Sequence, residues 1–515
     1  MRTESFGRLE GSTERRYGLQ WVLGSGLLAL CAAAWLLGGG PGWRGDAWLA
    51  IPAVLLLYVA LLARWPGQPD PPVWQRLAVP ASVLVLPLVQ WLPLPLWLWH
   101  ALPGRAPIAL ALAQAGVTPA HPAWSITPQR TEAAFWALSV PVAVYLATLL
   151  LPPLWQRRVL VLALAVGLLN VILGLAQLQS GGDPALFFYW GSDGAVAEGV
   201  FANRNHLASF LVALIPMAMA LWLDERAGAG GSSRWSLRQS VLVLAMIFLA
   251  VGVTATQSRS GFALLMGVLV ACGLWVMLQQ RALGTVSNRW LQSALVITVL
   301  LIVQYTLYGL LQRLGADPLD DLRWLFARQS LRVAALTHGW GWGIGSFVQA
   351  YDLIGDASAD QAFYVNHVHN DYLELWLEGG VVAVLAVGLA IAFLAVRWGR
   401  AIRGWRRADG TGSLLAVGAG LSLLALLLHS LVDYPLRTTA IEAYAAFLTA
   451  LLLGDRGAAA VGADAPPRAA STVPAVAPLP LAANDPVLFS ESSPLLLTPV
   501  SHPSIFFSRK DFHEK

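Results

Sequence analysis

The stretch His367-Val-His-Asn-Asp-Tyr-Leu-Glu-Leu-Trp-Leu-Glu-Gly-Gly380 ends the longest polar interval of an otherwise apolar chain and leads directly into a continuous apolar run. It contains two histidines, an asparagine and three carboxylates. Asn370 is well suited to cap a helix, because an asparagine side chain can accept hydrogen bonds from the first backbone amides of a helix. We therefore predict a helix that begins after Asn370 and leads into a membrane span.

His369 would lie at the positive end of this helix. A neutral imidazole is favoured over a charged one at that end, so the ring can accept a proton from a substrate. His367, His369 and Asp371 also spell His-x-His-x-Asp, a pattern that suggests a metal site. Alternate positions share a face only in a strand, and the residues after Asn370 have a helical pattern. We therefore expect no metal here.

The whole chain has the composition of a membrane protein. Of its 515 residues, 57% are hydrophobic and 12% are charged, whereas soluble proteins carry about 25% charged residues. Apolar runs of roughly 18 or more residues recur along most of the chain, which is the signature of membrane-spanning helices. We predict an all-α polytopic membrane protein with about twelve spans. Their approximate bounds are 17–38, 46–63, 77–99, 131–151, 159–178, 205–223, 239–257, 261–278, 290–311, 379–396, 413–432 and 438–454.

The distribution of arginine predicts the orientation of these spans. Cytoplasmic loops of membrane proteins carry an excess of basic residues. The predicted loops on the same side of the membrane as the N-terminus carry more arginines than the loops on the opposite side. This places residues 1–16 in the cytoplasm, a transmembrane domain at 17–454, and a large helical loop at about 312–378, between spans nine and ten, in the periplasm. Residues 455–515 are rich in Ala, Pro, Ser and Val, which predicts a disordered tail. The formal charge of +4 is small, and we expect membrane lipids but no nucleic acid as partners.

A second polar group directly precedes the sixth predicted span. It consists of the consecutive residues Asn203, Arg204, Asn205 and His206. One interpretation is a helix cap with interfacial anchors, and the other is a binding site for an anionic head group.

Arg259 lies between the seventh and eighth predicted spans with few polar residues around it. Inserting a cation at membrane depth costs roughly 2.5–3.5 kcal/mol, so such an arginine usually faces a partner or a cavity. The alternative is that its side chain extends to a lipid phosphate.

Further arginines lie in the large loop. Arg328 and Arg332 are i, i+4 neighbours on a predicted amphipathic helix, and Arg323 lies near its start. The apolar residues that define this helix are Leu325, Leu331, Val333 and Leu336.

The helix is followed by Gly339-Trp-Gly-Trp-Gly-Ile-Gly-Ser-Phe347, which resembles a phosphate-binding loop only superficially. No strand precedes it, and no Lys-Ser/Thr follows it. We therefore favour a tight turn that lets the backbone approach a substrate.

Taken together, these motifs resemble the O-antigen ligase and polymerase superfamily, which are lipid-linked glycan transferases of the bacterial envelope. The resemblance covers about residues 195–450. It rests on Phe-Ala-Asn-Arg-Asn-His-Leu-Ala, Gln-Ser-Arg-Ser-Gly, the arginine-rich helix with Gly-x-Gly-x-Gly-Ser-Phe, and His-x-His-Asn-Asp-Tyr-Leu-Glu followed by Glu-Gly-Gly. The last motif is the most specific.

The resemblance implies transfer of a glycan from undecaprenyl pyrophosphate to an acceptor at the periplasmic face of the bacterial inner membrane. It implies an inverting reaction that needs no nucleotide, metal or other cofactor. The acceptor is lipid A core for a ligase, another lipid-linked repeat for an O-antigen or exopolysaccharide polymerase, and a protein Ser or Thr for a protein O-oligosaccharyltransferase. We favour the ligase.

Carried over residue by residue, the resemblance implies three catalytic residues: His369, Arg259 and Arg323. Arg328 competes with Arg323 for its role, because a tryptophan that often follows the family arginine by four positions is replaced by Ala327. The residues predicted to bind substrate are Arg204, Asn205, Arg328, Arg332, His367, Asn370 and Asp371. Guanidinium groups suit a departing pyrophosphate, because they stay charged and bind phosphate oxygens in a fork.

The carboxylates Asp371, Glu374 and Glu378 either orient the acceptor or cap the helix start and favour its dipole, and we prefer the second interpretation. A polysaccharide transporter or flippase is the alternative from another functional class. It would require ionisable residues in mid-span and two related halves, whereas the ionisable residues here cluster in the predicted outer loops. A structural subunit of an envelope assembly would leave the arginines and histidine unexplained.

Overall fold

The chain folds into helices, and no strand occurs in the parts that the computed structural model describes. These parts are residues 3–40, 43–62, 73–119, 121–189, 194–228, 236–282, 300, 304, 319–353, 365–407 and 414–454. In chain order the helices are α1 (Thr3–Leu37), α2 (Trp43–Leu62), α3 (Val73–Trp91), α4 (Leu96–Ala101), α5 (Arg105–Gln114), α6 (Pro128–Ala137), α7 (Ser139–Leu150), α8 (Pro153–Gln179), the short η1 (Pro184–Leu186), α9 (Arg204–Gly228), α10 (Leu237–Ala255), α11 (Arg259–Ala282), α13 (Leu319–Ala335), α14 (Phe347–Asp352), α15 (Asp371–Arg407), α16 (Leu414–His429), the short η3 (Pro435–Arg437) and α17 (Thr439–Gly454).

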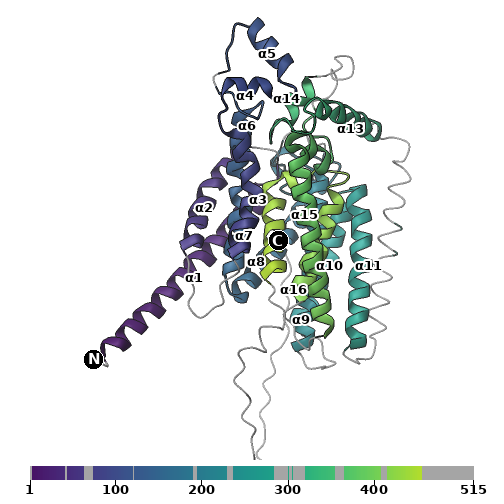
Figure 1. Cartoon of the computed structure of the whole chain (residues 1–515). Coiled ribbons are helices and arrows are strands. Elements are labelled where there is room, and N and C mark those ends of the chain that lie inside the picture. The colour runs from purple at the N-terminus through teal and green to yellow at the C-terminus, as the bar shows by residue number, and fades with distance from the viewer. Residues whose placement is uncertain are drawn as a thin grey trace, which may run out of the picture. The chain divides into compact units, whose positions relative to one another are not determined.

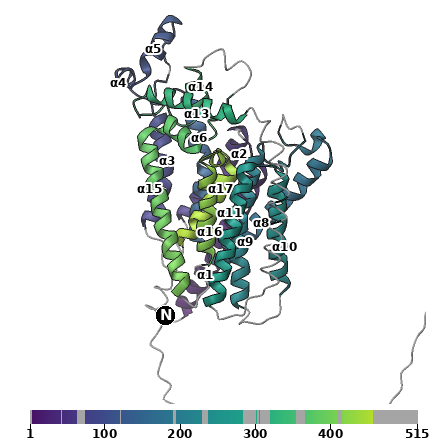
Figure 2. The ribbon, with the colours of Figure 1, turned by 90° about the vertical axis from the view of Figure 1, so that its right-hand side faces the viewer.

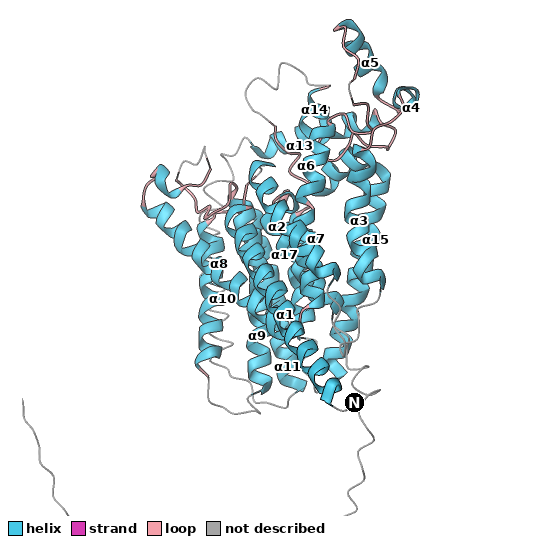
Figure 3. Cartoon of the chain, turned by 90° about the vertical axis from the view of Figure 1, so that its left-hand side faces the viewer, coloured by secondary structure: helices cyan, strands magenta, loops and turns pink. Residues whose placement is uncertain are grey.

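The long helices run side by side, and short helices lie at one end of them. Three views show α4, α5, α13 and α14 at this end and the N-terminus at the opposite end (Figures 1, 2 and 3). The central helix is α9, whose whole apolar stretch is buried against α8, α10, α11 and α16. A helix that is apolar on all sides and buried in protein can carry polar residues only at its ends without a large desolvation cost.

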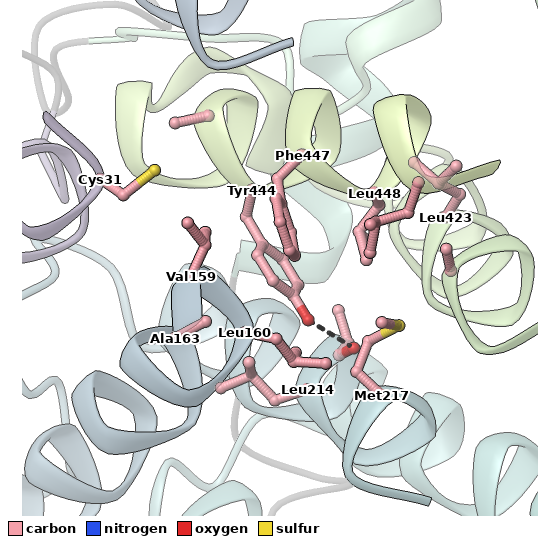
Figure 4. Packing of buried hydrophobic residues seen from close by; sticks show 14 of the residues in the cluster. Cys31, Val159, Leu160, Ala163, Leu214, Met217, Leu423, Tyr444, Phe447 and Leu448 are labelled. Carbon is pink, nitrogen blue, oxygen red and sulfur yellow. Dashed lines mark hydrogen bonds between the residues drawn. The ribbon is translucent and has the colours of Figure 1, made fainter. Parts of the chain in front are cut away.

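Dense packing holds the core around α9. Tyr444 points from α17 toward α9 and donates a hydrogen bond to the carbonyl oxygen of Ala213 at 3.3 Å (Figure 4). Leu160 from α8, Leu214 from α9 and Phe447 from α17 are fully buried in the same cluster. This packing fixes the helices relative to one another and thereby fixes where their ends lie.

The helices confirm the prediction of an all-α polytopic membrane protein. Seven described helices are long and apolar enough to cross a membrane, and four shorter apolar helices accompany them. All of the predicted span 290–311 except residues 300 and 304 lies outside the described residues, as does the predicted tail 455–515. The predicted span 77–99, which contains four prolines, is divided in two: α3 ends at Trp91, and α4 is a separate short helix after Pro93 and Pro95.

A break in α15 brings the glycine-rich segment against its backbone. Gly380 has φ +63°, and a Cβ there would lie 2.1 Å from the carbonyl oxygen of Gly339. That same oxygen accepts a hydrogen bond from the amide of Val381 at 2.8 Å. Only glycine fits this position, because both the backbone angle and the close approach exclude a side chain. Gly341 likewise lies against Glu378 and Gly380 of α15, whereas Gly343 and Gly345 lie against Ser125 and Arg130, so these glycines serve close contacts within the protein.

Candidate functional site

The candidate site is built where several helix ends meet. His369 lies two residues before the start of α15, and Asp433 lies in the short connection between α16 and α17. Asn205 belongs to the first turn of α9, and Arg259 begins α11. Hydrogen bonds link the starts of α9, α11 and α15 to the end of α16 and the α16–α17 connection, although these segments are far apart in sequence.

Asn370 caps α15 as the sequence predicted. Its side-chain oxygen accepts a hydrogen bond from the amide of Leu373 at 2.9 Å, and its amide group donates to the carbonyl of Leu431 at 2.8 Å. The residue before it, His369, has φ +57°, a left-handed conformation that is unusual for a residue other than glycine. In this conformation the His369 ring reaches Asp433 in the α16–α17 connection.

The ring of His369 is held by a buried carboxylate. Its Nδ1 lies 3.3 Å from Oδ1 of Asp433, and its ring packs edge-on against Tyr434 with 5.0 Å between centroids. The His369 side chain is 29% exposed, whereas Asp433 is fully buried. This arrangement orients the imidazole through Nδ1 and leaves Nε2 as the nitrogen that can exchange a proton with a substrate.

Asp433 is the centre of a dense polar group. It also accepts hydrogen bonds from the side chain of Asn205 and from the amide of Tyr434, and the buried ring of His206 lies 3.9 Å away. Burial alone would raise the pKa of Asp433, but the hydrogen bond with His369 and the charges of the surrounding histidines outweigh it and hold the pKa well below its ordinary value. Asp433 is therefore a carboxylate at any physiological pH.

The first interpretation of the polar group before α9, a helix cap, is confirmed, and its binding of an anionic head group stays a prediction. The side-chain oxygen of Asn203 accepts a hydrogen bond from the amide of Asn205 at 2.8 Å, which is a helix cap. The side chain of Asn205 in turn reaches Asp433, and Arg204 is partly exposed beside it. The cap therefore also brings Asn205 to the carboxylate that holds His369.

Arg259 is connected to the same group through its neighbour Ser260. The hydroxyl of Ser260 lies 2.8 Å from Nε2 of His429, the last residue of α16. The other ring nitrogen of His429 contacts the hydroxyl of Ser209 in α9. Arg259 itself is partly exposed at the start of α11.

The arginines of α13 divide between two sides of the helix. Arg323 is partly buried, and its charge acts on His429. Arg328 is five residues further along, about 140° around the helix, and is exposed, as is Arg332. The structure therefore brings Arg323 toward the other predicted catalytic residues and does not bring Arg328 or Arg332 there.

The predicted apolar face of α13 is wrong in part. Of its four residues only Val333 is buried, whereas Leu325, Leu331 and Leu336 are 40%, 53% and 39% exposed. The buried face consists of Phe326, Gln329, Ser330, Val333 and Ala334. Packing against α14 and α15, with the side chain of Gln329 bonded to Tyr351 of α14, decided which face is buried.

Arg437 forms ion pairs with the three carboxylates of residues 367–380. Its guanidinium lies 2.7 Å from Glu378 and 3.6 Å from both Asp371 and Glu374. Burial would lower the pKa of Arg437, but the three carboxylates outweigh it and raise the pKa, so the group stays charged. The three carboxylates therefore form a buried ion-pair cluster with Arg437, in addition to lying at the start of α15. The substrate-binding role of Asp371 stays a prediction.

His367 belongs to this second group and not to the first. Its Nδ1 lies 2.8 Å from Glu374, and its ring stacks on Tyr434 with 4.1 Å between centroids. His367 and His369 therefore contact different carboxylates on either side of Tyr434. Within the described residues, no group of three His, Cys, Asp or Glu side chains is arranged to hold a metal ion.

The amides of the glycine-rich segment are occupied by protein groups. Oε1 of Glu378 accepts hydrogen bonds from Gly345 and Phe347 at 2.9 and 3.1 Å, and its carbonyl accepts one from Gly343 at 2.8 Å. A phosphate-binding loop would present these amides to an anion. Here they hold Glu378 instead.

Three residues of the site were missed by sequence reasoning: Asp433, His429 and Arg437. All three flank or fill the short connection between two apolar runs, His429-Ser-Leu-Val-Asp-Tyr-Pro-Leu-Arg437. An acidic and a basic residue in so short a connection are a signal that could have been followed, because ionisable groups at a membrane boundary usually have partners.

A comparison with known protein families finds a match within the chain. Residues 244–388 match the family described as O-antigen ligase. This stretch of the chain is similar to O-antigen ligases. The O-antigen ligase match runs from within α10 to within α15, and it therefore includes Arg259, Arg323 and His369 but neither Asn205 nor Asp433. No curated protein matches the chain in a sequence search.

Proposed function

We propose that the protein transfers a glycan from undecaprenyl pyrophosphate to a sugar hydroxyl of an acceptor such as lipid A core, at the periplasmic face of the bacterial inner membrane. This is the O-antigen ligase type of reaction. The observation that carries the proposal is the pair of His369 and Asp433, a partly exposed imidazole backed by a fully buried carboxylate. The similarity of residues 244–388 to O-antigen ligases supports the class of substrate.

His369 is proposed as the general base. Nε2 of the ring takes the proton of the acceptor hydroxyl while its oxygen attacks the anomeric carbon of the donor sugar. Asp433 keeps the proton on Nδ1, which makes Nε2 the basic nitrogen, and it stabilises the imidazolium that forms. Single displacement by one acceptor oxygen predicts inversion at the anomeric carbon.

The arginines are proposed to bind the leaving group. As the bond from the anomeric carbon to the pyrophosphate oxygen breaks, its electron pair stays on that oxygen. Arg259 and Arg323 carry fixed positive charges that stabilise the developing negative charge. Arg204, in the same turn as Asn205, is proposed to contact the substrate phosphates.

A deletion strain and its complementation test the proposal. Lipopolysaccharide gels of a strain without this chain should show core that lacks long O-chains, with long lipid-linked chains accumulating. Wild-type chain should restore the ladder, whereas His369→Ala at equal membrane abundance should not. Core carrying one repeat would instead indicate a polymerase, and a normal ladder in the deletion strain would contradict the ligase reaction.

A further inference from the structure

His429 is a fully buried histidine that joins three helices at the level of the candidate site. Its two ring nitrogens contact Ser209 of α9 and Ser260 of α11, and the ring itself ends α16. Ser260 directly follows Arg259, and Ser209 lies one turn after Asn205. The ring therefore connects the start of α11 to the start of α9.

The hydrogen bonds of this ring have a defined direction. The hydroxyl of Ser209 donates to the carbonyl oxygen of Asn205 at 3.0 Å, so its oxygen accepts from His429. Nδ1 of His429 is then the donor, and Nε2 accepts from the hydroxyl of Ser260. A neutral imidazole satisfies both contacts at once, with no buried charge.

The chain of contacts continues to the proposed base. Asn205 donates from its side chain to Oδ2 of Asp433, and Oδ1 of Asp433 faces Nδ1 of His369 at 3.3 Å. A continuous series of polar contacts thus runs from the residue beside Arg259 to His369. Arg323 lies near enough to His429 for its charge to act on the ring.

We propose that His429 is a positioning residue that sets the placement of Arg259 relative to the Asp433–His369 pair. This inference rests on the proposed function and deepens it. A buried polar bridge across three helices costs desolvation and is satisfied only in one arrangement, so it specifies geometry more than it adds stability. A misplacement of about 1 Å between reacting groups can lower a rate by about 100-fold.

Two substitutions divide the chain of contacts at its centre. His429→Asn places a polar atom near the position of Nδ1 and retains the contact with Ser209, whereas His429→Gln reaches the position of Nε2 and retains the contact with Ser260. Each should lower kcat per folded molecule by about 10-fold or more while leaving the unfolding temperature close to that of the wild type. Ser422→Ala is the matched control, because Ser422 is a buried serine of α16 that bonds to Ala213 of α9 outside this chain of contacts.

Double variants separate positioning from a structural role. If both contacts of the ring act, adding Ser260→Ala to His429→Asn changes kcat no further, because that contact is already lost, and adding Ser209→Ala to His429→Gln changes it no further for the same reason. Losses that multiply, or losses that follow the folded fraction alone, would overturn the proposal. Ser260→Ala alone keeps the test available if the His429 variants fold poorly.

A readout without glycan transfer keeps this proposal distinct from the proposed function. Diethyl pyrocarbonate modifies accessible imidazoles, and His369 is partly exposed while His429 is fully buried. We expect the modification rate of His369, followed by mass spectrometry with exposed His338 as reference, to rise several-fold in His429→Asn/Ser209→Ala but not in Ser422→Ala. If the rate shifts while wild type transfers no glycan, the proposed function fails and the positioning role stands. An active wild type with unchanged rates and unchanged kcat in all variants would overturn the positioning role.

Discussion

Oδ1 of Asp433 lies 3.3 Å from Nδ1 of His369, and the carboxylate is fully buried while the imidazole is 29% exposed. The two residues are 64 positions apart, on either side of two apolar helices. Within the described residues the carboxylate faces His369 on one side and Asn205 of α9 on the other. Asp433 therefore connects His369, the predicted base, to the start of α9.

Replacing Asp433 by Asn should lower kcat by roughly 10²–10⁴-fold, because the ring loses the charge that stabilises its protonated form and holds its tautomer. The matched control is Asp224→Asn, which removes a carboxylate paired with Arg157 outside the site. Turnover in proteoliposomes, normalised to folded protein, checks this. Equal turnover of both variants would argue against a role for Asp433.

The charge of Asp433 should stabilise the fold over a wide pH range. Its pKa in the folded protein is depressed, so this stabilisation is complete above the ordinary pKa of about 4 and is lost as pH falls through the lower folded value. The difference in unfolding temperature between wild type and Asp433→Asn should stay constant from pH 8 to 5. It should shrink only below about pH 4. A difference that already shrinks near pH 6 would show that the pKa is not depressed.

Arg437 should be a stability residue. Replacing it by Met leaves the buried carboxylates Asp371, Glu374 and Glu378 without their cation, which should cost about 3–5 kcal/mol. Membrane abundance and unfolding temperature measure this loss. Adding Glu374→Gln should restore part of it, because one unpaired charge is removed. Wild-type stability of Arg437→Met alone would show that these carboxylates do not need the guanidinium of Arg437 to be buried.

The two arginines of α13 should differ in activity. Arg323→Ala should reduce glycan transfer by roughly 10²–10³-fold, since Arg323 is partly buried and lies near enough to His429 for its charge to act on the ring. Arg328→Ala should change transfer little, because Arg328 is exposed on another side of the same helix. Transfer assays on both variants at equal abundance decide between them. The reverse order would assign the catalytic role to Arg328.

Local rules predicted the start of α15 and the positions of most helices. Asn370 caps α15 because the residue type alone favours it, and apolar runs are sufficient to place membrane helices. The face of α13 was predicted less well. Leu331 has the right periodicity for burial but is exposed, since tertiary packing rather than residue pattern chose the buried side.

The partners of the site residues could not be predicted from the sequence. Ser209 and His429 are 220 positions apart, and no spacing rule links them. The same holds for Asn205 and Asp433. Only the folded arrangement of helix ends brings these side chains together, whereas the sequence motifs identify the residues that carry the chemistry one at a time.

The central claim is that His369 acts as the base in glycan transfer from a lipid pyrophosphate. Single-turnover transfer from a radiolabelled undecaprenyl-pyrophosphate glycan, with purified protein in proteoliposomes, measures this step directly. The account predicts that wild type forms one linked acceptor per undecaprenyl pyrophosphate released, and that His369→Ala retains the donor but transfers at least about 100-fold more slowly. Transfer by His369→Ala at the wild-type rate would contradict the account.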